Sequence, residues 1–147
     1  WHGVAELSKM RDTPKMIEEI QDRWQSKGHA IYIYPDASGA ATKTVNASIS
    51  DLALLEQAGF TVRANKANPR IKDRVAAMNA ALERGNVKIN PITCPNTADC
   101  LEQQTYKNGE PDKSSGHDHQ NDATTYPIAF TFPIRKRIAD IDFAFAV

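Results

Sequence analysis

Apolar positions along the chain follow two patterns, one typical of helices and one typical of strands. In the segment DTPKMIEEIQDRW they recur every three or four residues, with Thr13 as the expected cap and Pro14 at the first helical position. The segment HAIYIY is instead a continuous run of apolar, β-branched and aromatic residues. Such a run predicts a central strand that is buried on both faces of a sheet.

The alternation of helices and strands continues to about residue 106. Further helices are predicted in SISDLALLEQAG, where Ser48 and Asp51 give a capping-box-like start, and in NPRIKDRVAAMNAALERG and NTADCLEQQTY. Short strands are predicted between these helices, in FTVRA and VKI. Such alternation implies parallel strands with helices packed on the sheet, so we expect an α/β fold.

The last third of the chain begins with the polar segment KNGEPDKSSGHD, which is rich in Gly, Pro and Ser and is expected to be a loop. A last helix follows, predicted to reach Ala129 at most and to be interrupted around Pro127. We assign residues 1–133 to one domain. Residues 134–147 form a C-terminal tail with a basic cluster at Arg135, Lys136 and Arg137.

Composition narrows the class of protein without deciding its function. The 147 residues are 41% apolar and 24% charged, as in a globular domain. Lysine and arginine balance aspartate and glutamate at 18 each, so a nucleic-acid partner would need a local basic patch. Cys94 and Cys100 lack the C-x-x-C spacing of zinc sites and are predicted to be reduced thiols. No apolar run is long enough to span a membrane and no signal peptide is recognisable, which favours the cytoplasm.

Two aspartates open the last predicted helix, in the segment SSGHDHQNDATTYP. Asp118 and Asp122 are four residues apart and would lie on one helix face, where unpaired like charges repel. They are therefore expected either to be solvated, as acids favoured by the helix dipole, or to hold a positive group such as a metal ion. Asp36 is a third candidate, because it follows the strand HAIYIY at the end where α/β sheets bind ligands. A simple turn aspartate is the alternative for Asp36.

Carboxylates at a strand end and a helix start suit Mg²⁺ or Mn²⁺ better than zinc. Two such ions can activate water and stabilise the leaving oxygen in phosphodiester cleavage. His119 is expected to orient a carboxylate or to contact phosphate. Arg74 is expected to be a surface or ion-pair residue. The other candidate phosphate contacts are four basic residues near the acids: Lys43, Lys66, Arg70 and Lys113. Lys43 and Lys113 are favoured among them, because their loops flank the acids.

A family resemblance follows from the order and spacing of five segments, YIYPDASGAATKT, SDLALLEQAGF, NPRIKDRVAAMNAAL, CLEQQTY and PDK…DHQNDATTY. Together they resemble the C-terminal nuclease domain of the tailed-bacteriophage terminase large subunit, over roughly residues 3–133. That protein moves viral DNA into the prohead and cuts the concatemer. The resemblance implies a ribonuclease H-like fold, a mixed sheet flanked by helices, and a metal-dependent nuclease site of three or four acidic residues.

The resemblance also implies roles for individual residues. Asp36 matches the family's second acidic ligand, and Asp118 and Asp122 match the acidic pair of its helix motif. The family's first catalytic aspartate is expected on a strand before HGVAEL, and Glu6 lies where the third strand is expected, so Glu6 is given no role. The domain is thus expected to lack its first strands and, as a fragment, to have weak or no activity.

The partners implied by the resemblance are double-stranded DNA, an ATPase domain in the same polypeptide, the portal and the small terminase subunit, in the host cytoplasm. The ATPase's phosphate-binding pattern G-x-x-x-x-G-K-[ST] does not occur in the 147 residues. The leading hypothesis is a Mg²⁺- or Mn²⁺-dependent endonuclease, with two ions, that cuts DNA with little sequence preference. The alternatives are a junction-resolving or transposase-like nuclease, and a non-catalytic docking module for packaging proteins.

Overall fold

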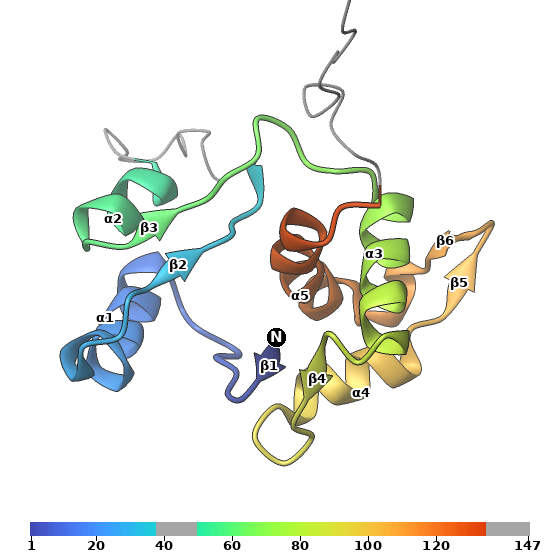
Figure 1. The fold of residues 1–147 in the computed structure, drawn as a ribbon, viewed down its shortest axis with the longest axis horizontal. Coiled ribbons are helices and arrows are strands. Elements are labelled where there is room, and N and C mark those ends of the chain that lie inside the picture. The colour runs from blue at the N-terminus through green and yellow to red at the C-terminus, as the bar shows by residue number, and fades with distance from the viewer. Residues whose placement is uncertain (38–49, 135–147) are drawn as a thin grey trace, which may run out of the picture.

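The computed structural model describes residues 1–37 and 50–134, and its elements form two groups (Figure 1). The N-terminal group contains helices α1 (Thr13–Arg23) and α2 (Asp51–Gln57) and strands β2 (Tyr32–Ile33) and β3 (Thr61–Val62). The C-terminal group contains helices α3 (Ile71–Glu83), α4 (Pro95–Gln103) and α5 (Asp118–Thr131) and strands β4 (Lys88–Ile89), β5 (Tyr106–Lys107) and β6 (Glu110–Pro111). Strand β1 (His2–Gly3) lies with the C-terminal group, and short 3-10 turns cover Gln25–Lys27 and Lys113–Ser115.

The strands pair in three short ladders. β1 is parallel to β4, with His2 opposite Lys88, and β2 is parallel to β3, with Tyr32 opposite Thr61. β5 and β6 form an antiparallel hairpin. The predicted alternation and parallel pairing are therefore confirmed. Within residues 1–37 and 50–134, no ladder joins the two parallel pairs to each other.

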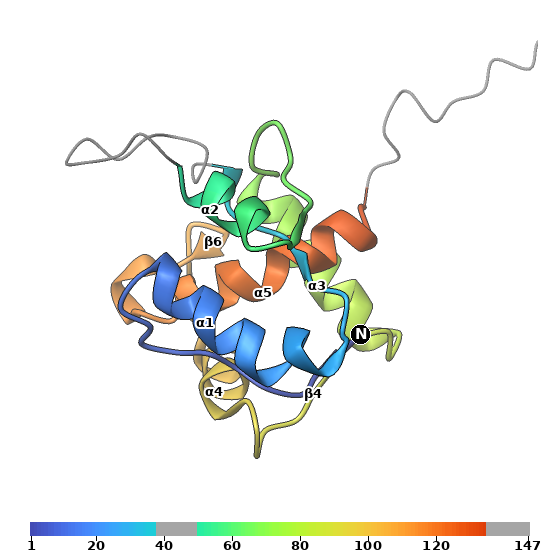
Figure 2. The same ribbon diagram turned by 90° about the vertical axis from the view of Figure 1, so that its left-hand side faces the viewer.

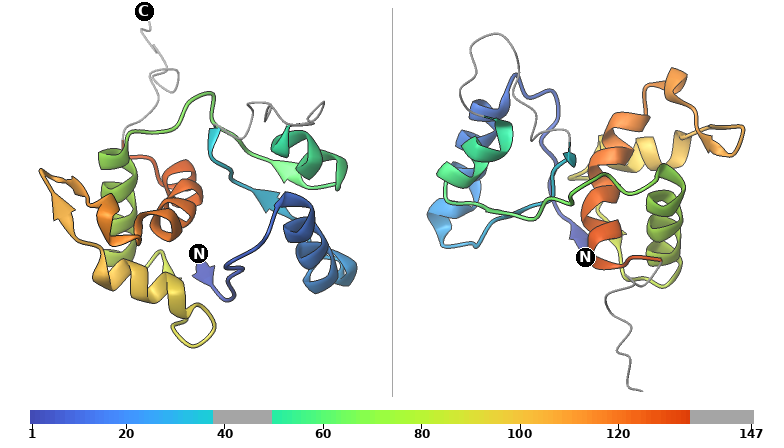
Figure 3. Two further views of the ribbon diagram at one scale, coloured as in Figure 1. Left: turned by 180° about the vertical axis from the view of Figure 1, so that it is seen from behind. Right: turned by 90° about the horizontal axis from the view of Figure 1, so that it is seen from above.

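The two groups are connected by the chain between β1 and α1 and by the chain between β3 and α3, as the views from behind and from above show (Figure 3). In a side view, α1 and α2 lie in front of α5 and α3 (Figure 2). Tyr34, after β2, also contacts the C-terminal group, because its ring packs edge-on against Phe130 of α5 with ring centres 5.1 Å apart. The end of β2 thus lies next to α5.

The helix boundaries show which local signals were interpreted correctly. Helix α1 is capped by Asp12, whose side chain accepts from the Lys15 N–H at 2.9 Å, so the prediction of Thr13 as the cap was wrong. Thr13 instead donates to Asp51 across the two helices. Helix α2 is capped by Ser50, and the predicted start at Ser48 lies outside the described residues.

The segment HAIYIY forms a shorter and more exposed strand than its composition predicts. Tyr32 is 49% exposed, so burial on both faces was wrong. The Arg63 guanidinium lies 4.3 Å from the centre of the Tyr32 ring. This face of the strand is therefore covered by a charged side chain and solvent, and not by a second layer of packed helices as expected. An apolar run cannot reveal this difference, because tyrosine tolerates both environments.

Two predictions for the last third of the chain were also wrong. The predicted loop after residue 106 contains the β5–β6 hairpin, whose turn residues Asn108 and Gly109 both have positive φ, 55° and 76°. Helix α5 runs through Pro127 without a break and ends at Thr131 rather than at Ala129. Proline leaves the carbonyl of Ala123 without its usual partner, and Ala123 is exposed, so water can bind it.

The hydrophobic core lies mainly in the C-terminal group, where α5 packs against α3 and α4. Its centre is formed by Met78, Ala81, Val87 and Ile128, with Ile89, Leu101 and Phe132 packed around it. Both cysteines are free thiols, as predicted. No helix in the described part of the chain is long and apolar enough to cross a membrane.

Candidate functional site

Asp36 and helix α5 are brought together by Tyr126. The Tyr126 hydroxyl donates to Oδ2 of Asp36 at 2.9 Å, across 90 residues of sequence. The Asn68 side chain, in the connection between β3 and α3, donates to Oδ1 of the same carboxylate at 2.7 Å. A second bond, from the backbone N–H of Ala37 to Asn68, closes this arrangement at 2.9 Å. Asp36 is therefore positioned on both of its oxygens, although it is exposed.

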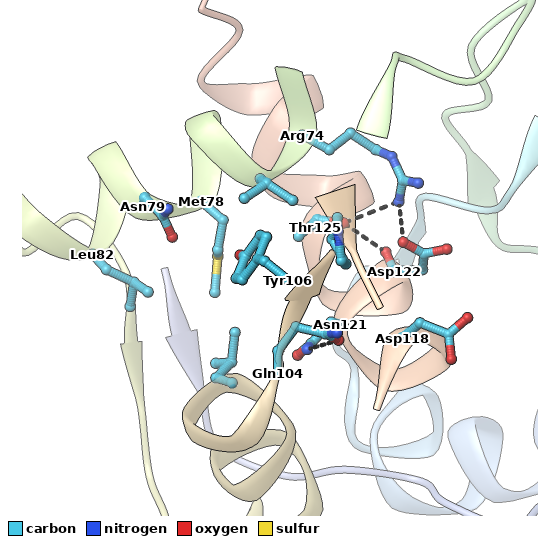
Figure 4. A pocket seen from close by; sticks show the side chains of 13 residues that line it. Arg74, Met78, Asn79, Leu82, Gln104, Tyr106, Asp118, Asn121, Asp122 and Thr125 are labelled. Carbon is cyan, nitrogen blue, oxygen red and sulfur yellow. Dashed lines mark hydrogen bonds and ion pairs between the residues drawn. The ribbon is translucent and has the colours of Figure 1, made fainter. Parts of the chain in front are cut away.

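Arg74 of α3 is the positive group beside the acidic helix face (Figure 4). Its Nη1 donates to Oδ1 of Asp122 at 2.9 Å and to the Thr125 hydroxyl at 3.1 Å. The guanidinium also lies 4.4 Å from the centre of the Tyr126 ring. Arg74 is 3% exposed, so the expectation of an ion pair is confirmed and that of a surface position is wrong. One side chain thus contacts the helix face that carries Asp122 and the ring that holds Asp36.

Asp118 and Asp122 share one face of α5, as their spacing predicts, but differ in exposure. Asp118 is 9% exposed, whereas the Asp122 side chain is 40% exposed despite its bond to Arg74. Both line a pocket whose other walls are α3, the end of α4 and the β5–β6 hairpin (Figure 4). The opposite end of this pocket carries the apolar side chains of Met78 and Leu82 (Figure 4). Acids and a guanidinium thus occupy one end of a partly apolar pocket.

Tyr126 is held in its protonated form. Burial raises the pKa of its hydroxyl to about 12, and the bond to the Asp36 carboxylate acts in the same direction, while the Arg74 charge opposes both. The hydroxyl is therefore a neutral donor at any physiological pH. Its hydrogen bond orients one oxygen of the Asp36 carboxylate.

The candidate DNA contacts lie in segments next to the site residues in the sequence. Lys66 and Arg70 are exposed in the segment before α3, and Lys113 is exposed in the 3-10 turn before α5. His119 is exposed on the first turn of α5. Lys43, and the basic cluster of the tail, lie outside the described residues. Exposure leaves the four described side chains accessible to phosphates, which is what such contacts require.

Carboxylate oxygens are the donors that Mg²⁺ and Mn²⁺ prefer, so the chemistry of Asp36, Asp118 and Asp122 fits these ions. The arrangement does not yet form a complete binding site. Within residues 1–37 and 50–134, no three His, Cys, Asp or Glu side chains are close enough together to hold a metal ion. One oxygen of Asp122 accepts from Arg74, and both oxygens of Asp36 accept from other side chains.

Sequence reasoning missed Tyr126 and Asn68 and misjudged Arg74. A signal existed for Tyr126, because it lies four residues after Asp122 and so shares the acidic helix face. For Asn68 no local pattern was available, since its partner Asp36 is 32 residues away. Arg74 lies between Ile71 and Val75, on a helix with an apolar stripe. A charged residue at such a position can form a buried ion pair only if the element packed against the helix carries an acid, and the sequence of the helix alone does not show this.

Glu6, which was given no functional role, is structural. Its carboxylate accepts from the backbone N–H groups of Asn96 and Thr97, at 3.0 and 2.9 Å, and from both of their side chains. These are N–H groups of the first turn of α4, which otherwise has no side-chain cap. Burial alone would raise the pKa of Glu6, but the hydrogen bonds outweigh it and hold the pKa below its usual 4.5.

Comparison with known families gives one match. The model of the family described as terminase RNaseH-like domain matches residues 1–129. Comparisons with curated proteins and with solved structures gave no match. The family match covers most of the chain, and it agrees with the α/β arrangement and with an acidic helix placed beside a strand end. This chain therefore belongs to the terminase RNaseH-like domain family, a nuclease-type domain of the terminase.

Proposed function

We propose that this domain hydrolyses phosphodiester bonds of double-stranded DNA during phage genome packaging, using Asp36, Asp118 and Asp122. The observation that best supports the proposal is the hydrogen bond from Tyr126 to Asp36, which holds an acid of the N-terminal group beside the acidic face of α5. The bond connects Asp36 to a residue one turn after Asp122 on α5, in a domain of nuclease type, and this supports the proposal.

The proposed cofactor is Mg²⁺ or Mn²⁺, with two ions bound. Bound divalent cations would activate water and stabilise the leaving oxygen. Asp36, Asp118 and Asp122 would hold them. The residues of the chain supply orientation: Tyr126 and Asn68 fix the Asp36 carboxylate, and burial fixes Asp118.

The proposed DNA surface combines the exposed basic residues around the acids. Lys66 and Arg70 approach from the segment before α3, and Lys113 and His119 from the start of α5. Phosphate contacts from such side chains position the duplex without reading its sequence, which suits cleavage with little sequence preference. The proposed further partners are the ATPase domain of the same polypeptide, the portal and the small terminase subunit, in the host cytoplasm.

The test is cleavage of supercoiled plasmid DNA, with Mg²⁺ or Mn²⁺, by the terminase large subunit that contains the complete nuclease domain. Asp36→Asn and Asp122→Asn should each reduce cleavage to background, because asparagine keeps the size of the side chain but lacks the charge that holds the cation. Asparagine is preferred to alanine at position 122, since its carbonyl can still accept from the buried Arg74. Asp22→Asn, at an exposed position of α1, is the matched control and should cleave normally.

Undiminished cleavage by both Asp36→Asn and Asp122→Asn would overturn the site assignment. Strong preference for branched DNA over linear duplex would instead indicate a junction-resolving nuclease. If the unsubstituted protein neither cleaves DNA nor binds Mn²⁺, the domain is better explained as a docking module for packaging proteins.

A further inference from the structure

Asp122 has a resident cation partner in the structure, and that partner is the Arg74 guanidinium. The Arg74 Nη1 lies 2.9 Å from Oδ1 of Asp122, which is the distance of a charge-assisted hydrogen bond. A divalent cation held by Asp122 would need a carboxylate oxygen of the same side chain. The guanidinium and a cation thus have the same ligand in common.

Arg74 is held firmly enough to compete. Its side chain is only 4% exposed, its Nη1 is shared with the Thr125 hydroxyl, and the guanidinium stacks on Tyr126. A side chain fixed in this way loses little further entropy when it binds Asp122, unlike an arginine on the surface.

Arg74 is also incompletely satisfied in this position. Its Nε is buried and has no hydrogen-bond partner among the described residues. A buried donor without a partner costs free energy, so the pairing with Asp122 is not the best arrangement a guanidinium can have.

We propose that Arg74 competes with divalent cations for Asp122 and thereby sets the cation concentration at which the nuclease site fills. The inference rests on the proposed function, because it assumes that Asp122 binds the cation. Arg74 is in this view a regulatory neighbour of the site and not a cation ligand.

The test is calorimetric titration of the 147-residue protein with Mn²⁺. Arg74→Met removes the charge but keeps a long apolar side chain against Tyr126, and it should bind Mn²⁺ about tenfold more tightly, which corresponds to about 1.4 kcal/mol. Arg74→Lys keeps the charge and should stay close to the unsubstituted protein. Arg84→Met, at the exposed end of the same helix, is the control and should not change the affinity.

Thr125→Val provides a second variant in case Arg74→Met does not fold, as judged by thermal unfolding. It removes the second bond of the guanidinium, together with the bond that the Thr125 hydroxyl donates to the backbone carbonyl of Asp122, so it should tighten Mn²⁺ binding in the same direction by a smaller factor. In the Asp122→Asn background, Arg74→Met should have no effect on affinity, because the shared ligand is gone.

The outcomes separate this inference from the proposed function. Equal or weaker Mn²⁺ binding by Arg74→Met and Thr125→Val, relative to the unsubstituted protein, overturns the competition while the cation site stands. If neither the unsubstituted protein nor these variants bind Mn²⁺, the cation site itself fails and the competition fails with it. Tighter Mn²⁺ binding by the variants supports the competition, since an arginine with only a structural role would not lower the affinity of the protein for Mn²⁺.

Discussion

The two groups of elements differ in how they are stabilised. In the described residues, the N-terminal group has two buried hydrophobic side chains, Leu55 and Phe60, whereas all other buried hydrophobic side chains belong to the C-terminal group. Asp118 and Asp122 are carried by the well-packed group and Asp36 by the other. Two of the three proposed acids therefore lie on well-packed elements, while the position of the third depends on a few contacts at the junction.

Those junction contacts are polar or aromatic rather than a shared hydrophobic core. Asp36 is bonded to Tyr126 and Asn68, and Tyr34 packs edge-on against Phe130. Individual contacts of this kind contribute about 0.5–1.5 kcal/mol each, less than a buried core side chain. The position of Asp36 is therefore expected to be more easily disturbed than that of Asp118 or Asp122.

The largest expected effect comes from truncating the core of the C-terminal group. Met78, at the centre of that core, is 2% exposed, and Met78→Ala should lower the free energy of unfolding by about 2–5 kcal/mol. Because α3, α4 and α5 share this core, hydrogen exchange should accelerate in all three helices. Urea unfolding and hydrogen exchange measure the two effects.

The matched variant in the N-terminal group is Leu55→Ala, at a side chain that is 3% exposed. It should accelerate exchange in α1, α2 and β3 and leave α3 and α5 protected, because few buried contacts connect the groups. If exchange in α3 and α5 accelerates as much as in Met78→Ala, the two groups form one cooperative unit and the comparison is wrong.

A smaller effect is expected at the cap of α4. Glu6→Gln replaces a carboxylate that accepts four hydrogen bonds by a neutral amide, and it should cost about 1–2 kcal/mol at neutral pH. Burial would raise the Glu6 pKa, but the bonds lower it below 4.5, so the carboxylate's contribution is fully present above that pH. It is lost as the pH falls through the lowered pKa of the folded protein.

Urea unfolding at several pH values checks this prediction. The difference between the unsubstituted protein and Glu6→Gln should be constant above about pH 4.5 and should shrink at lower pH. Glu18→Gln, in an exposed ion pair with Lys15, is the control and should change stability by less than about 1 kcal/mol. A difference that persists unchanged in acid would mean that the Glu6 charge is not what stabilises α4.

The sequence predicted the parts of the fold that depend on local signals. Helices ended where Gly59 and Gly85 allow positive φ, 82° and 69°, and apolar spacing located α3 and α4. The turn pair Asn108 and Gly109 is an equally local signal for the β5–β6 hairpin, although the polar residues around it are typical of a loop.

The remaining differences depend on tertiary contacts that no local pattern contains. Pro127 suggested a break, but α5 continues because packing against α3 and α4 stabilises both sides of the proline. Arg74 was expected to be a surface or ion-pair residue, and its burial could not be predicted because its partner Asp122 lies 48 residues away in the sequence. The placement of Asp36 beside α5 was a reasonable expectation from topology, whereas the tyrosine that fixes it there came only from the structure.

The smallest expected effect acts directly on the junction. Tyr126→Phe removes the hydroxyl that donates to Asp36 but keeps the ring against Arg74, so it should cost about 0.5–1.5 kcal/mol. The effect of Tyr126→Phe on the structure should be local, since the Asp36 carboxylate is exposed and keeps its hydrogen bond from Asn68. Hydrogen exchange should therefore accelerate in residues 31–37, with the exchange of α3 and α5 almost unchanged.

Tyr106→Phe is the control for the loss of a tyrosine hydroxyl, because Tyr106 is 55% exposed and lies on the hairpin, away from the junction. It should leave residues 31–37 unaffected. Equal exchange in these residues for Tyr126→Phe and the unsubstituted protein would mean that the remaining contacts fix the end of β2, namely the packing of Tyr34 on Phe130 and Trp1 and the bonds made by Asn68. The N-terminal group would then position Asp36 without help from the hydrogen bond to α5.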